Sequence, residues 1–209
     1  MYKVFINHKT IFLTDSFKKV KNFDDSLYTK YCCNEEILEL VNLIKIDIKL
    51  KQIVLFGKDV DFLLEQFKKT LKVIEAAGGI VKNKQDEILC IYRNGFWDFP
   101  KGKLEQGEDI STTAVREIKE ECGVNNIKII EELNTTYHIY FENNVPVLKV
   151  TYWFLMDATF FEGPLIPQKE EGIEKAEWLN KKQMMAVFYP KTYESLKDLF
   201  DKSLSMLYD

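Results

Sequence analysis

Cysteine is scarce in this sequence, and the placement of the four that occur excludes several chemistries. Cys32, Cys33, Cys90 and Cys122 form no CxxC pair and no metal-ligand spacing. None of them lies in a recognisable Cys/His setting, so a thiol nucleophile is not supported. Because the chain also begins without the apolar stretch of a signal peptide, we interpret the cysteines as reduced thiols and expect a cytoplasmic protein.

Long apolar runs and an excess of basic residues are missing as well. A central run such as Tyr152–Met156 is far too short to span a bilayer, so no membrane partner is expected. The 29 Lys and Arg residues are outnumbered by 33 Asp and Glu, which argues against a dedicated nucleic-acid binder. With 46% hydrophobic and 30% charged residues, the composition is that of a globular protein and excludes a fibrous or disordered chain.

Charge is distributed unevenly along the 209 residues, and this predicts two domains. Residues 1–72 carry 13 Lys against 10 Asp and Glu, whereas the rest of the chain has an acidic balance. We expect residues 1–72 to form a small α+β accessory domain and residues 73–209 to form the main domain. The elements expected in the first are a hairpin (Lys3–Asn7 and Thr10–Thr14), a helix (Asn34–Asp47), a strand (Gln52–Phe56) and a second helix (Asp59–Glu75).

The main domain alternates strand and helix patterns and contains no internal repeat. Asp109 is placed to cap a helix that ends at Cys122, where Gly123 supplies the stop. The other expected elements are a hairpin (Gly79–Lys82 and Glu87–Tyr92), strands at Ile127–Leu133, Thr136–Glu142, Val147–Met156 and Ala176–Leu179, and a final helix at Thr192–Leu207. This order predicts an α/β fold.

The Asp109–Cys122 helix concentrates acidic residues. Glu117, Glu120 and Glu121 fall at i, i+3 and i+4 and cluster on a face distinct from the apolar one. Like charges at this spacing destabilise a helix by roughly 0.2–0.5 kcal/mol per pair. A bound hard cation such as Mg²⁺ or Mn²⁺ would reverse the sign, because these ions take oxygen ligands. The alternative is a solvated glutamate face.

The spacing around these glutamates resembles the Nudix box at every defined position. The matching residues are Gly102, then Glu108 after five residues, Arg116-Glu117-Ile118 after seven more, Glu120-Glu121 after one, and Gly123-Val124 after one. The resemblance covers roughly residues 73–190. It implies an α/β/α sandwich around a mixed sheet, and a hydrolase that cleaves a phosphoanhydride in a nucleoside diphosphate-linked substrate with a divalent metal. Residues 1–72 resemble no family that we can name.

The resemblance also implies roles for individual residues. Glu117, Glu120 and Glu121 would be the metal ligands, with Mg²⁺ or Mn²⁺ as the cofactor. Gly102 would allow a tight turn, and Glu108 and Arg116 would form a supporting pair. The general base in this family is a helix glutamate or a loop glutamate, which makes Glu120, Glu121 and Glu171 the catalytic candidates. We favour Glu121 as base or ligand and keep Glu171 as the rival.

Substrate contacts are predicted from position and residue type. Arginine is rare, since the chain has only Arg93 and Arg116 beside 27 lysines. We therefore expect each arginine to be used for the bidentate contacts that its planar guanidinium can make. The candidates are Arg93 for phosphate, Trp97 for base stacking, Lys101 and Lys103 for phosphate oxygens, and His138 and Tyr140, which alternation places on one strand face. The alternatives are a surface arginine, a core tryptophan and a hydrogen-bonded histidine.

The loop Trp97–Lys103 resembles that of dinucleoside polyphosphate hydrolases and decapping-type relatives, with a lysine where many members have Gly-Gly. We therefore expect a polyphosphate-rich substrate such as a dinucleoside polyphosphate or a nucleoside triphosphate. The alternatives are an ADP-ribose or nucleotide-sugar pyrophosphatase, a non-catalytic nucleotide-sensing module and a prenyl diphosphate isomerase. The expected partner is a small-molecule nucleotide, with a homodimer left open.

Overall fold

The computed structural model describes residues 1–20 and 24–208, and the chain divides into two compact units. The first unit comprises Met1–Ile74 and Tyr137–Val150, and the second comprises Glu75–Thr136 and Thr151–Asp209. Two long strands, β5 (Lys72–Lys82) and β11 (Val145–Asp157), contribute residues to both units. Each unit is described by itself.

The first unit is built on a sheet with the strand order β11-β10-β1-β2-β4-β3. β1 and β2 form the predicted antiparallel hairpin, whereas β2, β4 and β3 run parallel and β1 is parallel to β10. The elements are β1 (Tyr2–Ile6), β2 (Lys9–Thr14), a 3₁₀ turn (Phe17–Lys19), β3 (Ser26–Lys30), α1 (Asn34–Ile46), β4 (Gln52–Phe56), α2 (Val60–Thr70) and β10 (Thr136–Glu142).

Helices α1 and α2 follow directly from their sequence patterns. α1 buries Ile37, Leu40, Val41 and Ile44, which recur at the helical period and form one apolar stripe. α2 begins after Asp59, whose carboxylate accepts hydrogen bonds from two backbone N–H groups of the first turn. The two helices contact one another and complete the α+β arrangement expected for this part of the chain.

Two expectations for the first unit differ from the structure. The helix expected over Asp59–Glu75 ends at Thr70, because residues from Lys72 onward extend into β5, where the Glu75 carbonyl accepts a hydrogen bond from the Leu104 backbone N–H. Strand β3 was not predicted. It ends the strand order and, among the residues that the structure describes, pairs with β4 alone, so its support comes from a partner distant in sequence rather than from an alternating local pattern.

The second unit has the strand order β12-β6-β5-β11, with β7, β8 and β9 pairing with β6, β5 and β11 respectively. Its further elements are β6 (Ile88–Arg93), β7 (Phe96–Asp98), β8 (Lys101–Lys103), α3 (Ile110–Cys122), β9 (Lys128–Glu132), a 3₁₀ turn (Lys169–Glu171), β12 (Ile173–Leu179), α4 (Lys181–Gln183), a π-helical turn (Met184–Phe188), a 3₁₀ turn (Tyr189–Lys191) and α5 (Glu194–Tyr208). No helix in the described ranges combines the length and apolar character needed to cross a membrane.

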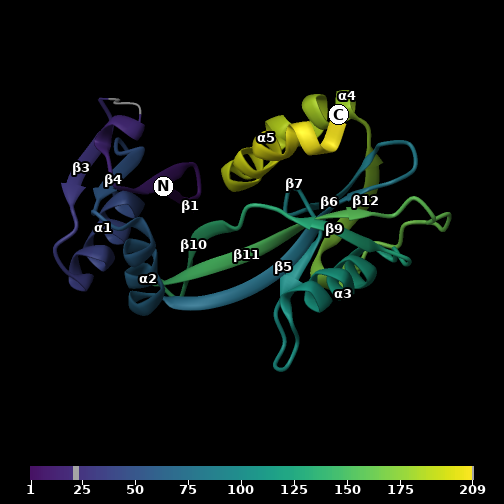
Figure 1. The fold of residues 1–209 in the computed structure, drawn as a ribbon, viewed down its shortest axis with the longest axis horizontal. Coiled ribbons are helices and arrows are strands. Elements are labelled where there is room, and N and C mark those ends of the chain that lie inside the picture. Colours follow the sequence, from purple (N-terminus) through teal and green to yellow (C-terminus); the bar gives the residue numbers. More distant parts are fainter. Residues whose placement is uncertain (21–23, 209) are drawn as a thin grey trace. The chain divides into compact units, whose positions relative to one another are not determined.

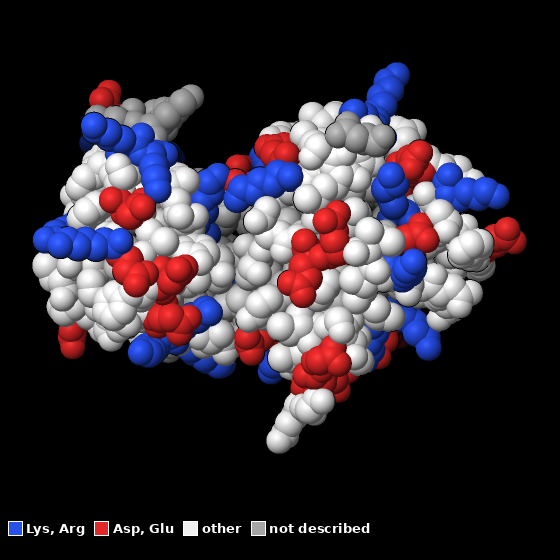
Figure 2. Space-filling model, viewed as in Figure 1, with Lys and Arg blue, Asp and Glu red and all other residues white. Residues whose placement is uncertain are grey.

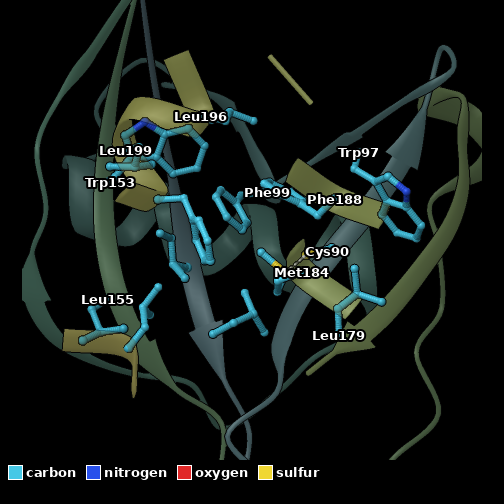
Figure 3. Packing of buried hydrophobic residues seen from close by; sticks show 14 residues of the cluster. Cys90, Trp97, Phe99, Trp153, Leu155, Leu179, Met184, Phe188, Leu196 and Leu199 are labelled. Atoms are coloured by element: carbon cyan, nitrogen blue, oxygen red, sulfur yellow. Dashed lines mark hydrogen bonds between the residues drawn. The ribbon is translucent and has the colours of Figure 1, made fainter. Parts of the chain in front are cut away.

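Alternating residues of these strands fill two separate cores. On β6, Ile88 and Cys90 belong to a cluster with α5, whereas Leu89 and Ile91 belong to a cluster with α3. The first cluster draws side chains from the strands and the C-terminal helical segments toward one another (Figure 3). Helices α3 and α5 therefore cover opposite faces of the sheet (Figure 1), and the predicted α/β/α sandwich with a preceding α+β segment is confirmed.

Candidate active site

Helix α3 is positioned by a cap at each end and by its apolar face. The Asp109 carboxylate accepts hydrogen bonds from the Thr112 backbone N–H at 2.8 Å and from the hydroxyls of Ser111 and Thr112. Gly123 ends the helix with a φ of 73°, in the left-handed region where glycine is unstrained. Ala114 and Ile118 are fully buried against the sheet, so the rest of the helix surface carries the acidic residues.

Arg116 joins the helix to the preceding loop through a bidentate contact with Glu108. Its Nε donates to Oε1 at 2.7 Å and its Nη2 donates to Oε2 at 2.8 Å. Nη2 also donates to the backbone carbonyl of Lys103, at 3.1 Å. Hydrogen bonds from Arg116 and from the Thr113 hydroxyl hold the pKa of Glu108 down at about 2. Arg116 and Glu108 therefore join α3 to the loop before it, and their supporting role in the site stays a prediction.

Glu117 and Glu120 converge on the same guanidinium. Glu117 Oε1 and Glu120 Oε2 each lie 2.8 Å from Arg116 Nη1, so these two oxygens are separated by no more than twice that distance. Burial raises the pKa of Glu117, and the hydrogen bond from Arg116 opposes this rise. A Cβ on Gly102 would overlap the Glu117 carboxyl group, so glycine is needed there for the loop to approach the helix.

Glu121 has a different environment from the other two. Its side chain is fully buried, whereas that of Glu120 is 47% exposed. Glu121 Oε2 accepts a hydrogen bond from the Lys101 backbone N–H at 2.8 Å. Burial raises its pKa to about 7, although Lys101 and Arg93 act in the opposite direction. The helix therefore presents one buried, one largely buried and one half-exposed carboxylate rather than a single acidic face.

Arg93 lies close to the three carboxylates of Glu121, Glu171 and Asp98. Arg93 Nη1 lies 3.4 Å from Glu121 Oε1 and 3.8 Å from Glu171 Oε2, and its Nε lies 3.9 Å from Asp98 Oδ2. The structure therefore brings the predicted phosphate contact and both candidate bases together. Asp98 was not predicted, although a lone charge inside the aromatic run Phe96–Phe99 is a signal that sequence reading could have used.

The other predicted substrate contacts in the second unit are Trp97, Lys101 and Lys103, and they differ in exposure. The Lys101 ammonium pairs with Asp98, and its side chain is only 11% exposed. Trp97 is buried in the α5-side core and packs against Tyr92, with 5.2 Å between ring centroids. Lys103 is exposed at the end of β8. Whether Trp97, Lys101 and Lys103 contact substrate stays a prediction.

His138 and Tyr140 lie in the first unit, on β10. Their rings are stacked with centroids 6.5 Å apart, and the Tyr140 hydroxyl donates a hydrogen bond to Glu142 at 3.0 Å. The predicted shared face is therefore present. The structure groups these residues with residues 1–74 and not with the box, and their contact with substrate stays a prediction.

The donor set suits a hard divalent cation by chemistry, since it offers carboxylate oxygens from neighbouring turns and a glycine loop beside them. Within the described residues, no group of three or more His, Cys, Asp or Glu side chains is gathered closely enough to hold a metal ion. Glu117 and Glu120 point to Arg116 and Glu121 points to a backbone N–H. Metal binding by all three carboxylates therefore requires side-chain rotation.

The fold and this geometry define an α/β/α sandwich protein in which a glycine loop and an acidic helix are joined by one arginine. A family model described as the NUDIX domain matches residues 72–200. The chain belongs to the Nudix family, as the pattern from Gly102 to Val124 indicated.

Relatives with assigned names agree with the predicted enzyme class. The chain is 29% identical over 132 residues to the 8-oxo-dGTP diphosphatase of Escherichia coli, which covers 59% of this chain and 93% of that protein. It is 28% identical over 133 residues to the m7GpppN-mRNA hydrolase of Saccharomyces cerevisiae, which covers 62% of this chain but only 13% of the yeast protein. This chain thus spans a small part of the yeast relative.

Solved structures show the same fold. A C. elegans Ap4A hydrolase, solved as a binary complex, matches with a TM-score of 0.50 and 21% identity, covering 64% of this chain and 97% of that one. A MutT protein from Methanosarcina mazei matches with a TM-score of 0.51 and 14% identity, covering 66% and 98%. In both cases nearly the whole of the other protein is covered by about two thirds of this chain.

Proposed function

We propose that this chain is a divalent-metal-dependent pyrophosphohydrolase that cleaves a phosphoanhydride bond in a nucleotide. The observation that carries the proposal is the placement of Arg93, at the end of β6, beside Glu121 of the loop–helix motif that also holds the Arg116-bound carboxylates. The motif offers a cation for phosphate and anionic oxygens for a divalent ion, which are the two requirements of an attack on a charged diphosphate.

Each residue has a role that its contacts support. Glu117, Glu120 and Glu121 would hold Mg²⁺ or Mn²⁺, which when bound screens phosphate charge and lowers the pKa of a coordinated water. Arg93 would orient a phosphate oxygen, since its guanidinium already lies among acceptors at 3.4–3.9 Å. As the alternative to ligating the ion, Glu121 would accept the proton of the attacking water, because burial raises the pKa of its carboxyl group above the usual range. Glu171 remains the rival base.

The substrate we propose is a nucleoside that carries a chain of three or more phosphates. The names of the two relatives support this choice, because 8-oxo-dGTP and m7GpppN both contain a guanosine-type nucleoside attached to three phosphates. On the face shown in Figure 2, acidic and basic side chains are interspersed rather than separated by sign, which suits a small substrate better than a long polyanion. We also propose a cytoplasmic location, since all four cysteines are free thiols.

A hydrolysis screen tests the substrate proposal. Nucleoside triphosphates, dinucleoside polyphosphates, nucleotide sugars and ADP-ribose are each incubated with Mg²⁺ or Mn²⁺, and the products are separated by chromatography. We expect the triphosphates and dinucleoside polyphosphates to be cleaved fastest. Preferential cleavage of ADP-ribose or of a nucleotide sugar would contradict the proposed substrate and leave the enzyme class in place.

Glu120→Gln tests the assignment of the metal ligands. The amide keeps the shape of the side chain but binds a hard cation poorly, so we expect turnover to fall by 10²-fold or more, roughly the effect of losing one strong electrostatic contact in the transition state. The 47% exposure of Glu120 makes a folding defect avoidable, and a circular dichroism melt checks this. A variant with the wild-type rate would refute the assignment.

A nucleotide-sensing module is the second candidate, and one observation favours it. Glu117 and Glu120 are both engaged by Arg116, and the described residues contain no assembled metal cluster. A sensing module would bind nucleotides by calorimetry and hydrolyse none of them with either metal. Turnover that requires Glu120 would exclude it.

A further inference from the structure

Asp98 is the last residue of β7 and contacts Lys101 and Arg93, the two cations beside Glu121. The residue is 2% exposed, and its Oδ2 forms an ion pair with the Lys101 ammonium. The same oxygen lies 3.9 Å from Arg93 Nε. Its other oxygen, Oδ1, is buried and has no hydrogen-bond partner within the described residues.

Folding gains little from this carboxylate. A buried acceptor without a partner is destabilising, and a buried ion pair is often no better for stability than an apolar pair of the same size. The strand that carries Asp98 is already held by its backbone, because β7 pairs with β6 in the register Ile91↔Asp98. The buried charge of Asp98 therefore lowers stability, and the pairing of β7 with β6 does not depend on it. Such a group needs another explanation.

Both partners of Asp98 are the groups that hold Glu121. Lys101 donates its backbone N–H to Glu121 Oε2 at 2.8 Å, and Arg93 Nη1 lies 3.4 Å from Glu121 Oε1. Asp98 and Lys101 are separated by only Phe99 and Pro100, and proline has a fixed φ. The ion pair therefore links the Lys101 side chain to the end of β7 across two residues.

We propose that Asp98 is a positioning residue for Glu121. Its carboxylate clamps the Lys101 side chain and the Arg93 guanidinium, so that the Lys101 N–H and the Arg93 fork hold the Glu121 carboxylate in one orientation. The inference rests on the proposed function in so far as Glu121 is a metal ligand or base. It assigns Lys101 to the clamp, with its ammonium directed at Asp98 rather than at a phosphate.

The test compares Asp98→Asn, Lys101→Met and the double variant with the wild-type protein. Mn²⁺ binding is measured by electron paramagnetic resonance of the free ion, kcat and KM are measured on the best nucleotide of the screen, and a thermal melt reports stability. Glu194→Gln serves as the matched control, since it breaks a Lys–carboxylate pair of the same i,i+3 spacing on α5, with Lys197 at 2.7 Å.

We expect each single variant to weaken Mn²⁺ binding roughly tenfold, in the range for residues that orient a metal ligand, and to lower kcat more than it changes KM. The double variant should be no worse than either single variant, because the two residues act as one unit. The melting temperature of the double variant should stay close to that of the wild type. Glu194→Gln should leave Mn²⁺ binding unchanged.

A pure charge effect gives a different pattern and would overturn the proposal. Removing Asp98 takes away a negative charge and removing Lys101 takes away a positive one, so charge alone would shift the Mn²⁺ dissociation constant in opposite directions. Additive losses in the double variant, or unchanged binding in both single variants, would also overturn it. If the wild-type protein binds Mn²⁺ but hydrolyses nothing, the proposed function fails while the Mn²⁺ series still decides the role of Asp98. A wild-type protein that binds no Mn²⁺ overturns both.

Discussion

At the level of single residues, burial and hydrogen bonds have opposite effects on the pKa of a carboxyl group, and Glu121 shows this. Its carboxylate is fully buried, and the loss of water raises its pKa to about 7 even though Arg93 and Lys101 lie nearby. The neighbouring Glu108 is paired bidentately, and its pKa is held down at about 2. Two glutamates thirteen residues apart thus differ in protonation behaviour, because burial outweighs the contacts of Glu121 whereas the hydrogen bonds from Arg116 dominate at Glu108.

The shifted pKa of Glu121 makes stability depend on pH. Its folded pKa lies above the unfolded value, so the contribution of the neutral form is fully present below pH 4.5 and is lost as the pH rises to about 7. The cost of ionising Glu121 at pH 8 is about 3 kcal/mol at most, from 1.36 kcal/mol per unit of pKa. We therefore expect Glu121→Gln to increase the free energy of unfolding by roughly 1–3 kcal/mol at pH 8.

Urea denaturation in the presence of EDTA at pH 4 and pH 8 measures this effect. At pH 4 the Glu121→Gln variant and the wild type should have the same stability, because Glu121 is already neutral there. Glu120→Gln is the control, since it removes a half-exposed carboxylate from the same helix. A Glu121→Gln variant that is less stable than the wild type at pH 8 would contradict the burial argument.

Gly102 is the second residue whose substitution has a clear expected consequence. A Cβ there would overlap the Glu117 carboxyl group, which is the mobile end of a side chain rather than backbone. We expect Gly102→Ala to fold, to displace Glu117 and to lower kcat by tenfold or more, because small misplacements of catalytic groups are costly. Gly163→Ala is the control, since its Cβ would reach only the Phe161 ring, at 3.2 Å. Equal kcat values for the two variants would be inconsistent with the packing described.

Among the elements, α3 depends on its N-terminal cap. The Asp109 carboxylate accepts one backbone and two hydroxyl hydrogen bonds, and these contacts lower its pKa to about 2. We expect Asp109→Ala to reduce the free energy of unfolding by about 1 kcal/mol, the usual value for a lost cap. Asp109→Asn keeps an acceptor and should lose only part of this. Urea denaturation of the three proteins provides the comparison, and an Ala variant as stable as the wild type would contradict the assigned cap.

Segments with a clear alternating or apolar pattern, such as β4 and β10, were predicted as strands, whereas β3 and the short strands β7 and β8 were not. The β1–β2 hairpin and α3 emerged from local alternation, helical spacing and caps. β3 was missed because its support is β4, and the start of β5 was assigned to a helix because Lys72–Glu75 fits either pattern until β8 pairs beside it. Local patterns do not contain the identity of a distant partner strand.

At the level of the whole chain, the role of residues 1–72 stays open, and we propose that they form an accessory domain that selects substrate or mediates dimerisation. They supply β1, which pairs in parallel with β10 in the register Val4↔Tyr137. Deleting residues 1–72 should leave the β10 backbone without this partner, and unpaired edges promote association. We expect the truncated protein to change its mass in light scattering, by losing a dimer or by associating through the exposed β10 edge, and to change its order of preference in the hydrolysis screen. An unchanged mass together with an unchanged substrate range would remove the proposed role.

The spacing of residues along the chain was enough to identify α3, its caps and the Nudix pattern, because helical period, capping and motif spacing are local properties. It did not indicate that Glu121 would be buried, that Lys101 would pair with Asp98, or that His138 and Tyr140 would be grouped with residues 1–74. These features depend on segments brought together from different parts of the chain. Desolvation and charge pairing arise only when those segments pack, so the three-dimensional arrangement was needed to separate one glutamate from another.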